Sequence, residues 1–213
     1  MKESLKRSIS GVIYILIMWT CTSYSELSLS ILFFIIGIIS FYEMWKLRKD
    51  KTKILAFLFI SIPFVIIHFF GIINLVLENN QFDSDIILFI FILTWTFDTF
   101  AYIFGLNFGK TKIMPSISPK KSWEGFIGGF VFTFLSAYIT SIYFIEIETV
   151  QAITISLFLP FTATAGDFTE SYYKRKAGVK DSGNFIPGHG GMLDRMDAFM
   201  ITIPVLYIYL NIN

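Results

Sequence analysis

Long apolar runs separated by short polar segments dominate the pattern of hydrophobic and polar positions along the chain. A helix needs about 20 apolar residues to cross a hydrocarbon core about 30 Å thick. The chain contains seven runs close to that length, and we predict that each forms a transmembrane helix. The predicted spans are residues 9–23, 27–44, 54–77, 86–108, 126–145, 150–168 and 196–212.

The first run leaves one alternative open. Residues 1–25 combine a basic start, a short apolar run and a small polar end, which is also typical of a signal peptide. Multi-span proteins seldom need a cleaved signal, so we expect this span to be retained. Cleavage would leave six spans and would not change the orientation of the others.

Composition agrees with this pattern. Hydrophobic residues make up 54% of the 213 residues and charged residues only 15%, whereas soluble domains carry about 25% charged residues. The predicted fold class is therefore all-α, a polytopic integral membrane helix bundle of about seven transmembrane helices. The only cysteine is Cys21, so no intramolecular disulfide forms.

The basic residues are sorted along the chain. Lys and Arg next to membrane spans stay in the cytoplasm. All 17 of them lie before the first span or in alternate connections. In the other connections, the only charged residues are acidic. This pattern predicts a cytoplasmic N-terminus and an outside C-terminus. The basic residues are Lys2, Lys6, Arg7, Lys46, Arg48, Lys49, Lys51, Lys53, Lys110, Lys112, Lys120, Lys121, Lys174, Arg175, Lys176, Lys180 and Arg195.

Carboxylates within or beside the apolar runs indicate a site. An ionised group is costly in hydrocarbon, so it usually faces the bundle interior or a water-filled cavity. Asp98 falls in the middle of its run. Asp167 and Glu170 are three residues apart and share a helix face, and the same spacing recurs at Asp194 and Asp197. For Asp197 alone, an interfacial capping acid is the alternative interpretation.

The segment "PGHGGMLDRMD", residues 187–197, adds the features of a phosphate and metal site. Clustered carboxylates repel unless a cation lies between them, and Mg²⁺ is usually held by carboxylates together with substrate phosphates. Glycine N–H groups approach an anion closely, and nearby Lys and Arg side chains suit phosphate oxygens. The segment "GKTKIMPSISPKKSWEG", residues 109–125, supplies more bases in what we predict to be an irregular loop. Neither segment contains a Walker A pattern, and no nucleic-acid partner is expected.

These residues resemble a known family. The segment "SYYKRKAGVKDSGNFIPGHGGMLDRMD", residues 171–197, looks like the signature of the phosphatidate cytidylyltransferases, also called CDP-diacylglycerol synthases. A Ser, a Lys-Arg pair, a Lys-Asp pair, His-Gly-Gly and a closing Asp-Arg-x-Asp stand in the same order and spacing. The segments "GDFTES", "DTFAYIFGLNFGK" and "SPKKSWEG" also resemble parts of the family. The resemblance runs from residue 98 to the C-terminus; in its N-terminal half the family usually has more spans.

The resemblance implies an enzyme that converts CTP and phosphatidic acid into CDP-diacylglycerol and pyrophosphate with Mg²⁺. The composition and the apolar runs predict one membrane domain, residues 1–213, and the resemblance divides it into N-terminal spans in 1–97 and a catalytic half in 98–213. The expected metal ligands are Asp167, Asp194 and Asp197, with a monovalent cation as the candidate for a second ion. The expected catalytic residues are Asp167, Asp194, Lys174, Arg175, Lys180 and Arg195. The expected substrate-binding residues are Asp98, Lys120, Lys121, Ser122, Ser171, Asp181, His189, Gly190 and Gly191.

The expected partners are CTP, phosphatidic acid and the bilayer, and a second copy of the chain is a further candidate, as a homodimer. The expected location is the inner membrane, multi-pass, with the site facing the cytoplasm. Two other functions are alternatives. A CTP-dependent polyprenol or phytol kinase is disfavoured by the complete signature. A cation or proton transporter is disfavoured because the acids cluster at one membrane face, with only Asp98 deeper.

Overall fold

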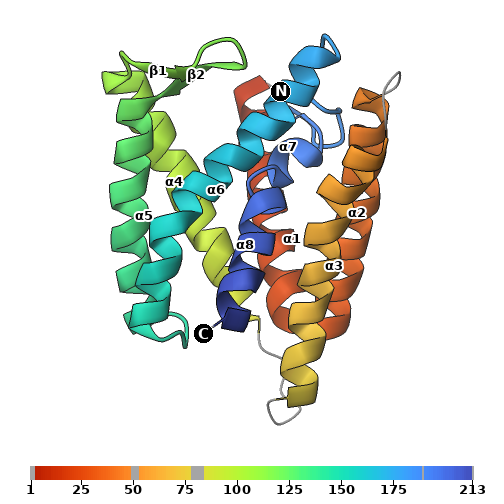
Figure 1. Ribbon diagram of the computed structural model, residues 1–213, viewed down its shortest axis with the longest axis vertical. Coiled ribbons are helices and arrows are strands. Elements are labelled where there is room, and N and C mark those ends of the chain that lie inside the picture. Colours follow the sequence, from red (N-terminus) through yellow and green to blue (C-terminus); the bar gives the residue numbers. More distant parts are fainter. Residues whose placement is uncertain (1–2, 49–52, 78–83, 189, 213) are drawn as a thin grey trace.

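The computed structural model describes residues 3–48, 53–77, 84–188 and 190–212, which form one bundle of helices with a small hairpin at one end (Figure 1). The prediction of an all-helical fold is confirmed apart from that hairpin. The helices are α1 (Glu3–Tyr24), α2 (Glu26–Leu47), α3 (Ile54–Leu77), α4 (Asp85–Phe108), α5 (Trp123–Tyr143), α6 (Thr149–Lys176), α7 (Leu193–Met196) and α8 (Phe199–Ile212). The strands are β1 (Lys112–Met114) and β2 (Ser118–Ser122).

Many of these helices have the length and composition of membrane spans. Within the described residues, five helical stretches are long and apolar enough to cross a bilayer: α2, α4, α5, α6 and the stretch Leu193–Ile212. The other two predicted spans correspond to shorter apolar segments, Ile9–Tyr24 and Phe57–His68. The chain is therefore a helical protein with several candidate spans.

The charge pattern coincides with the two ends of this bundle. Figure 1 places the start of α1, the end of α2, the hairpin and α7 at the upper end. These are the elements next to the basic segments of the sequence. The connection between α5 and α6 and the end of α8 lie at the lower end (Figure 1). Among the described residues, the basic segments and the acidic connection between α5 and α6 thus lie at opposite ends of the bundle.

Aromatic side chains and glycines hold the helices together. The ring of Phe91 on α4 stacks on Phe33 of α2 with centroids 6.2 Å apart, and meets the edge of Phe199 on α8 at 5.1 Å. Between α4 and α5 the contact is closer, because a Cβ at Gly125 would lie 2.6 Å from the carbonyl oxygen of Ala101. Small residues at such positions let membrane helices pack backbone to backbone.

The segment predicted to be an irregular loop is instead an antiparallel hairpin, so that prediction was wrong. Strands β1 and β2 pair with Lys112 opposite Ser122. Pro119 lies within β2 although it has no N–H to donate, which a two-stranded ribbon tolerates because each strand has a free outer edge. Ser122 then caps α5 by accepting a hydrogen bond from the Gly125 N–H at 3.2 Å.

Two boundaries near the predicted site also differ from the prediction. Helix α6 continues to Lys176 rather than ending near residue 168. The predicted span 196–212 is not one helix: the four-residue α7 is followed by a break at Asp197 and Ala198, and then by α8. The break lies against α6, because a Cβ at Gly166 would collide with the carbonyl oxygen of Asp197.

Candidate active site

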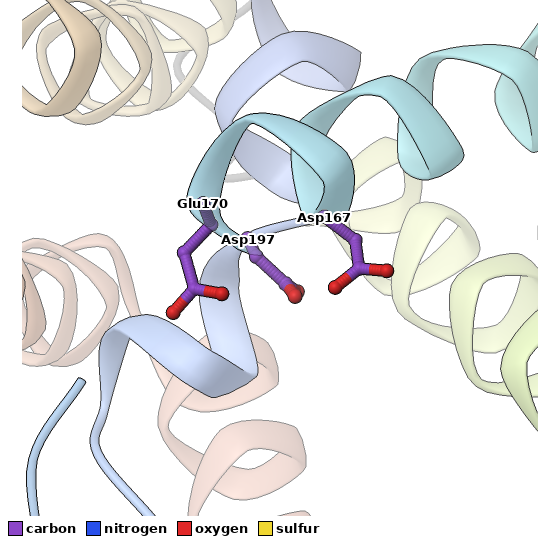
Figure 2. A group of neighbouring side chains, drawn as sticks. All are labelled: Asp167, Glu170 and Asp197. Carbon is purple, nitrogen blue, oxygen red and sulfur yellow. The ribbon is translucent and has the colours of Figure 1, made fainter. Parts of the chain in front are cut away.

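Three carboxylates meet where α6 passes the break between α7 and α8. Asp167 and Glu170 project from α6, and Figure 2 shows the Asp197 side chain between them. One oxygen from each of the three carboxylates lies within 4.8 Å of the others. The spacing along α6 places the first two on one face, and the close backbone contact at Gly166 brings in the third. We call Asp167, Glu170 and Asp197 the acidic cluster.

The acidic cluster has the chemistry of a cation site. Asp167 Oδ2 and both carboxylate oxygens of Glu170 are buried; Asp167 Oδ2 and Glu170 Oε2 each face only a lysine ammonium, and Glu170 Oε1 receives no hydrogen bond from the described part of the chain. Buried carboxylates are costly when they lack hydrogen-bond donors, and neighbouring carboxylates repel one another. A hard divalent cation such as Mg²⁺ takes carboxylate oxygens as ligands and offsets both costs. The residues present therefore fit a Mg²⁺ ion.

Two lysines flank the acidic cluster. Lys121, at the end of the hairpin, forms an ion pair with Asp167. Lys174 forms ion pairs with Glu170, one turn earlier on α6, and with Asp194 at 2.7 Å. Burial by itself lowers the pKa of Lys121, but the Asp167 carboxylate more than offsets this, so the pKa lies above its ordinary value. Lys121 therefore stays protonated at neutral pH and is available to pair with anions.

Asp194 is held by the glycine-rich segment before α7 and does not belong to the acidic cluster. Its Oδ1 accepts a hydrogen bond from Lys174 Nζ, and its Oδ2 accepts from the backbone N–H groups of Ser182 at 3.0 Å and Gly191 at 2.7 Å. Gly190 adopts a φ of 84°, a left-handed conformation that favours glycine. Asp194 as a metal ligand stays a prediction, and Glu170 takes that place within the acidic cluster.

A cavity of about 190 Å³ opens beside the acidic cluster. Asp98 of α4 lines it together with Arg195 and Asp197. Tyr14 of α1 forms part of the same wall. The structure thus brings Asp98, the mid-span acid of the sequence, to the same cavity as the acids of the last span.

The remaining predicted residues fall into two groups. Some make structural contacts: Ser171 donates a hydrogen bond to Asp167 Oδ1 at 3.4 Å, and Ser122 caps α5. Arg175 donates to the carbonyls of Ile117 at 3.2 Å and Val179 at 2.9 Å, which ties the hairpin to the end of α6. Others are exposed: Lys120, Lys180 and Asp181. His189 lies outside the described residues.

The sequence-based prediction missed Glu43. This residue lies inside the second predicted span, so the argument that singled out Asp98 applied to it as well. Its side chain is buried and accepts hydrogen bonds from the segment that holds Asp194. The sequence signal that could have identified Glu43 is its position as an acid near the end of an apolar run.

Comparisons with known proteins agree with these features. Residues 49–213 match the model of the Cytidylyltransferase family. The chain is 34% identical to the phosphatidate cytidylyltransferase of Rickettsia typhi over 210 residues, which is 94% of this chain and 89% of the relative. It is 47% identical over 125 residues to that of Thermotoga maritima, covering 56% of this chain and 46% of the relative. For Staphylococcus saprophyticus the identity is 40% over 167 residues, covering 77% and 63%. The matched part of the chain thus covers less than two thirds of the length of each of these last two relatives.

Proposed function

The chain belongs to the cytidylyltransferase family, and on that premise we propose that it transfers CMP from CTP to phosphatidic acid in phospholipid biosynthesis. The products are CDP-diacylglycerol and pyrophosphate. The observation that carries the proposal is the acidic cluster with its flanking lysines, at the basic end of a bundle of apolar helices. Such a site is suited to joining a nucleotide from water to a phosphate at the membrane surface.

The chemistry needs charge neutralisation and positioning more than covalent help from the protein. An oxygen of the lipid phosphate attacks the α-phosphorus of CTP, and the bond from that phosphorus to the bridging oxygen of the pyrophosphate breaks. The phosphate monoester is already ionised near pH 7, since its second pKa is about 6, so no general base is required. Both reactants are anions, and Lys121, Lys174 and Arg195 are the bases that border the acidic cluster or the cavity.

Mg²⁺ is the proposed cofactor, and Asp167, Glu170 and Asp197 are the residues that would hold it. When bound, the ion neutralises charge on the nucleotide phosphates and on the leaving pyrophosphate. We keep Asp194 as a further candidate ligand, because Lys174 joins it to Glu170, and a monovalent cation as the candidate for a second ion.

The proposed topology has seven spans in an inner membrane. The upper end of Figure 1, with the N-terminal end of α1 and the candidate site, faces the cytoplasm, where CTP is found. The support is the gathering of basic segments at that end. Residues 98–213 form the catalytic half, with contributions from α1 and α2 to its walls.

One experiment separates this proposal from a lipid kinase. The protein, purified in detergent, is incubated with Mg²⁺, phosphatidic acid or a polyprenol, and CTP labelled at either the α- or the γ-phosphate. CMP transfer puts the α-label into a lipid and releases the γ-label as pyrophosphate. A γ-label recovered in lipid would point to phosphoryl transfer instead and contradict the proposal.

A further inference from the structure

Glu43 is a buried carboxylate that reaches the candidate site from a distant part of the sequence. It projects from α2, before the family match begins at residue 49, and is only 5% exposed. Its Oε1 accepts a hydrogen bond from the Met192 N–H at 3.1 Å. Its Oε2 accepts from the Leu193 N–H at 2.8 Å and from the Ser182 hydroxyl at 2.9 Å. Both carboxylate oxygens are therefore engaged by the segment of residues 182–193.

That segment is shaped around the carboxylate. A Cβ at Gly183 would collide with Oε1 of Glu43, and a Cβ at Gly191 would lie 2.5 Å from Oε2. Helix α7 has no side-chain cap of its own. The first N–H groups of a helix need acceptors, and a negative charge at this end is stabilised by the partial positive charge of those N–H groups. Glu43 supplies that cap from another helix.

The contacts of Glu43 continue into the acidic cluster. Ser182 Oγ lies 2.9 Å from Glu43 Oε2 and 3.0 Å from Asp194 Oδ2, so one hydroxyl, with a single proton shared between two acceptors, bridges the two carboxylates. Asp194 then holds Lys174, which also pairs with Glu170. A shift of the segment of residues 182–193 would therefore displace Asp194 and, through their ion pair, the side chain of Lys174.

We infer that Glu43 is a positioning residue: its carboxylate fixes Ser182, Met192 and Leu193 so that Asp194 and Lys174 are held beside the acidic cluster. Glu43 is not itself a ligand or a base for the reaction, because its oxygens already accept hydrogen bonds from the protein. Hydrogen-bond partners that orient functional carboxylates commonly affect activity about 10- to 100-fold. The catalytic part of this inference rests on the proposed function, and the structural part does not.

The test is Glu43→Gln, with Glu26→Gln as the matched control on the same helix at the opposite end of the bundle. Gln keeps the size of the side chain but turns an NH₂ group toward N–H donors, so at least one loop contact is lost. Hydrogen exchange should become faster at the amides of Met192 and Leu193. The kcat for CMP transfer should fall about 10- to 100-fold, with a smaller change in KM, because positioning for the transition state is lost. Glu26→Gln should change neither the hydrogen exchange of these amides nor kcat.

A second variant covers the case in which Glu43→Gln does not fold. Ser182→Ala removes the bridging hydroxyl and leaves the backbone bonds to Glu43 in place, so kcat should fall by a smaller factor. Where both variants fold, their effects should not add. Unchanged exchange in Glu43→Gln would overturn the structural part, and unchanged kcat in both folded variants would overturn the positioning role. A wild-type protein that labels no lipid contradicts the proposed function alone, since exchange is measured without substrate.

Discussion

Replacing Glu170 by Gln should weaken Mg²⁺ binding without disrupting the bundle. Glu170 is fully buried in the acidic cluster, and Gln keeps its size while removing its charge. At 4.8 Å and an effective dielectric constant of about 20, two unit charges interact by about 3.5 kcal/mol. Because 4.8 Å limits the separation of the carboxylate oxygens, this energy is the scale of the repulsion between two of them. A bound Mg²⁺ carries two charges and lies closer, so its attraction to one carboxylate is at least this large, which corresponds to at least a few hundred-fold in affinity.

Part of that loss is returned, because the neutral Gln no longer repels Asp167 and Asp197. We therefore expect the Mg²⁺ concentration at half-maximal activity to rise about 10- to 100-fold. In the metal-free protein, the loss of the ion pair with Lys174 opposes this relief of repulsion, and Lys174 keeps Asp194 as a partner, so Tm should change little. A direct readout without substrate is the rise in Tm on adding Mg²⁺, which should be smaller in the variant than in the wild type.

The two ligand sets can be separated by comparing Glu170→Gln with Asp194→Asn in these two measurements. If the acidic cluster holds the ion, Glu170→Gln shifts both the half-saturating Mg²⁺ concentration and the Mg²⁺-induced change in Tm. Asp194→Asn then lowers kcat but has a smaller effect on the half-saturating Mg²⁺ concentration and on the Mg²⁺-induced change in Tm. The reverse ranking, with Glu170→Gln indistinguishable from wild type, would refute the assignment of the ion to the buried acidic cluster.

Three further predictions follow from the structure. Gly166→Ala should lower both Tm and activity, because its methyl group meets the backbone at the α7–α8 break; normal values for both would contradict that contact. Asp98→Asn should lower kcat less than Asp167→Asn, since Asp98 lines the cavity outside the acidic cluster, and equal losses would make it a ligand. In a cysteine-free background and intact cells, a cysteine at Glu148 should react with an impermeant thiol reagent and one at Lys112 should not; the opposite pattern would invert the topology.

Local pattern was sufficient for much of this molecule. Apolar runs of the right length predicted the positions of the main helices, because a segment in hydrocarbon must satisfy its backbone hydrogen bonds internally. The alternation of basic and acidic connections predicted which connections share an end of the bundle. The spacing of Asp167 and Glu170 placed two carboxylates on one face, since helical periodicity is a property of the chain itself.

Local pattern misled where the chain leaves regular structure. Residues 109–125, with two prolines, were predicted to be irregular, but they pair as a hairpin because each strand needs a partner on one side only. The repeated spacing of Asp194 and Asp197 predicted one shared face, and both residues line the same cavity. The spacing did not indicate that the helix ends at Asp197 or that the two side chains have different partners.

Tertiary packing decided the partners of each acid. Asp197 joins the acidic cluster because Gly166 lets its backbone lie against α6, and Asp194 turns to the N–H groups of the glycine-rich segment. Glu43 reaches that segment across about 140 to 150 residues of sequence. Spacing along the chain determines which side chains share a face of one helix. The meeting of different helices depends on side-chain volume and close backbone contact summed over the whole bundle, which no single segment contains.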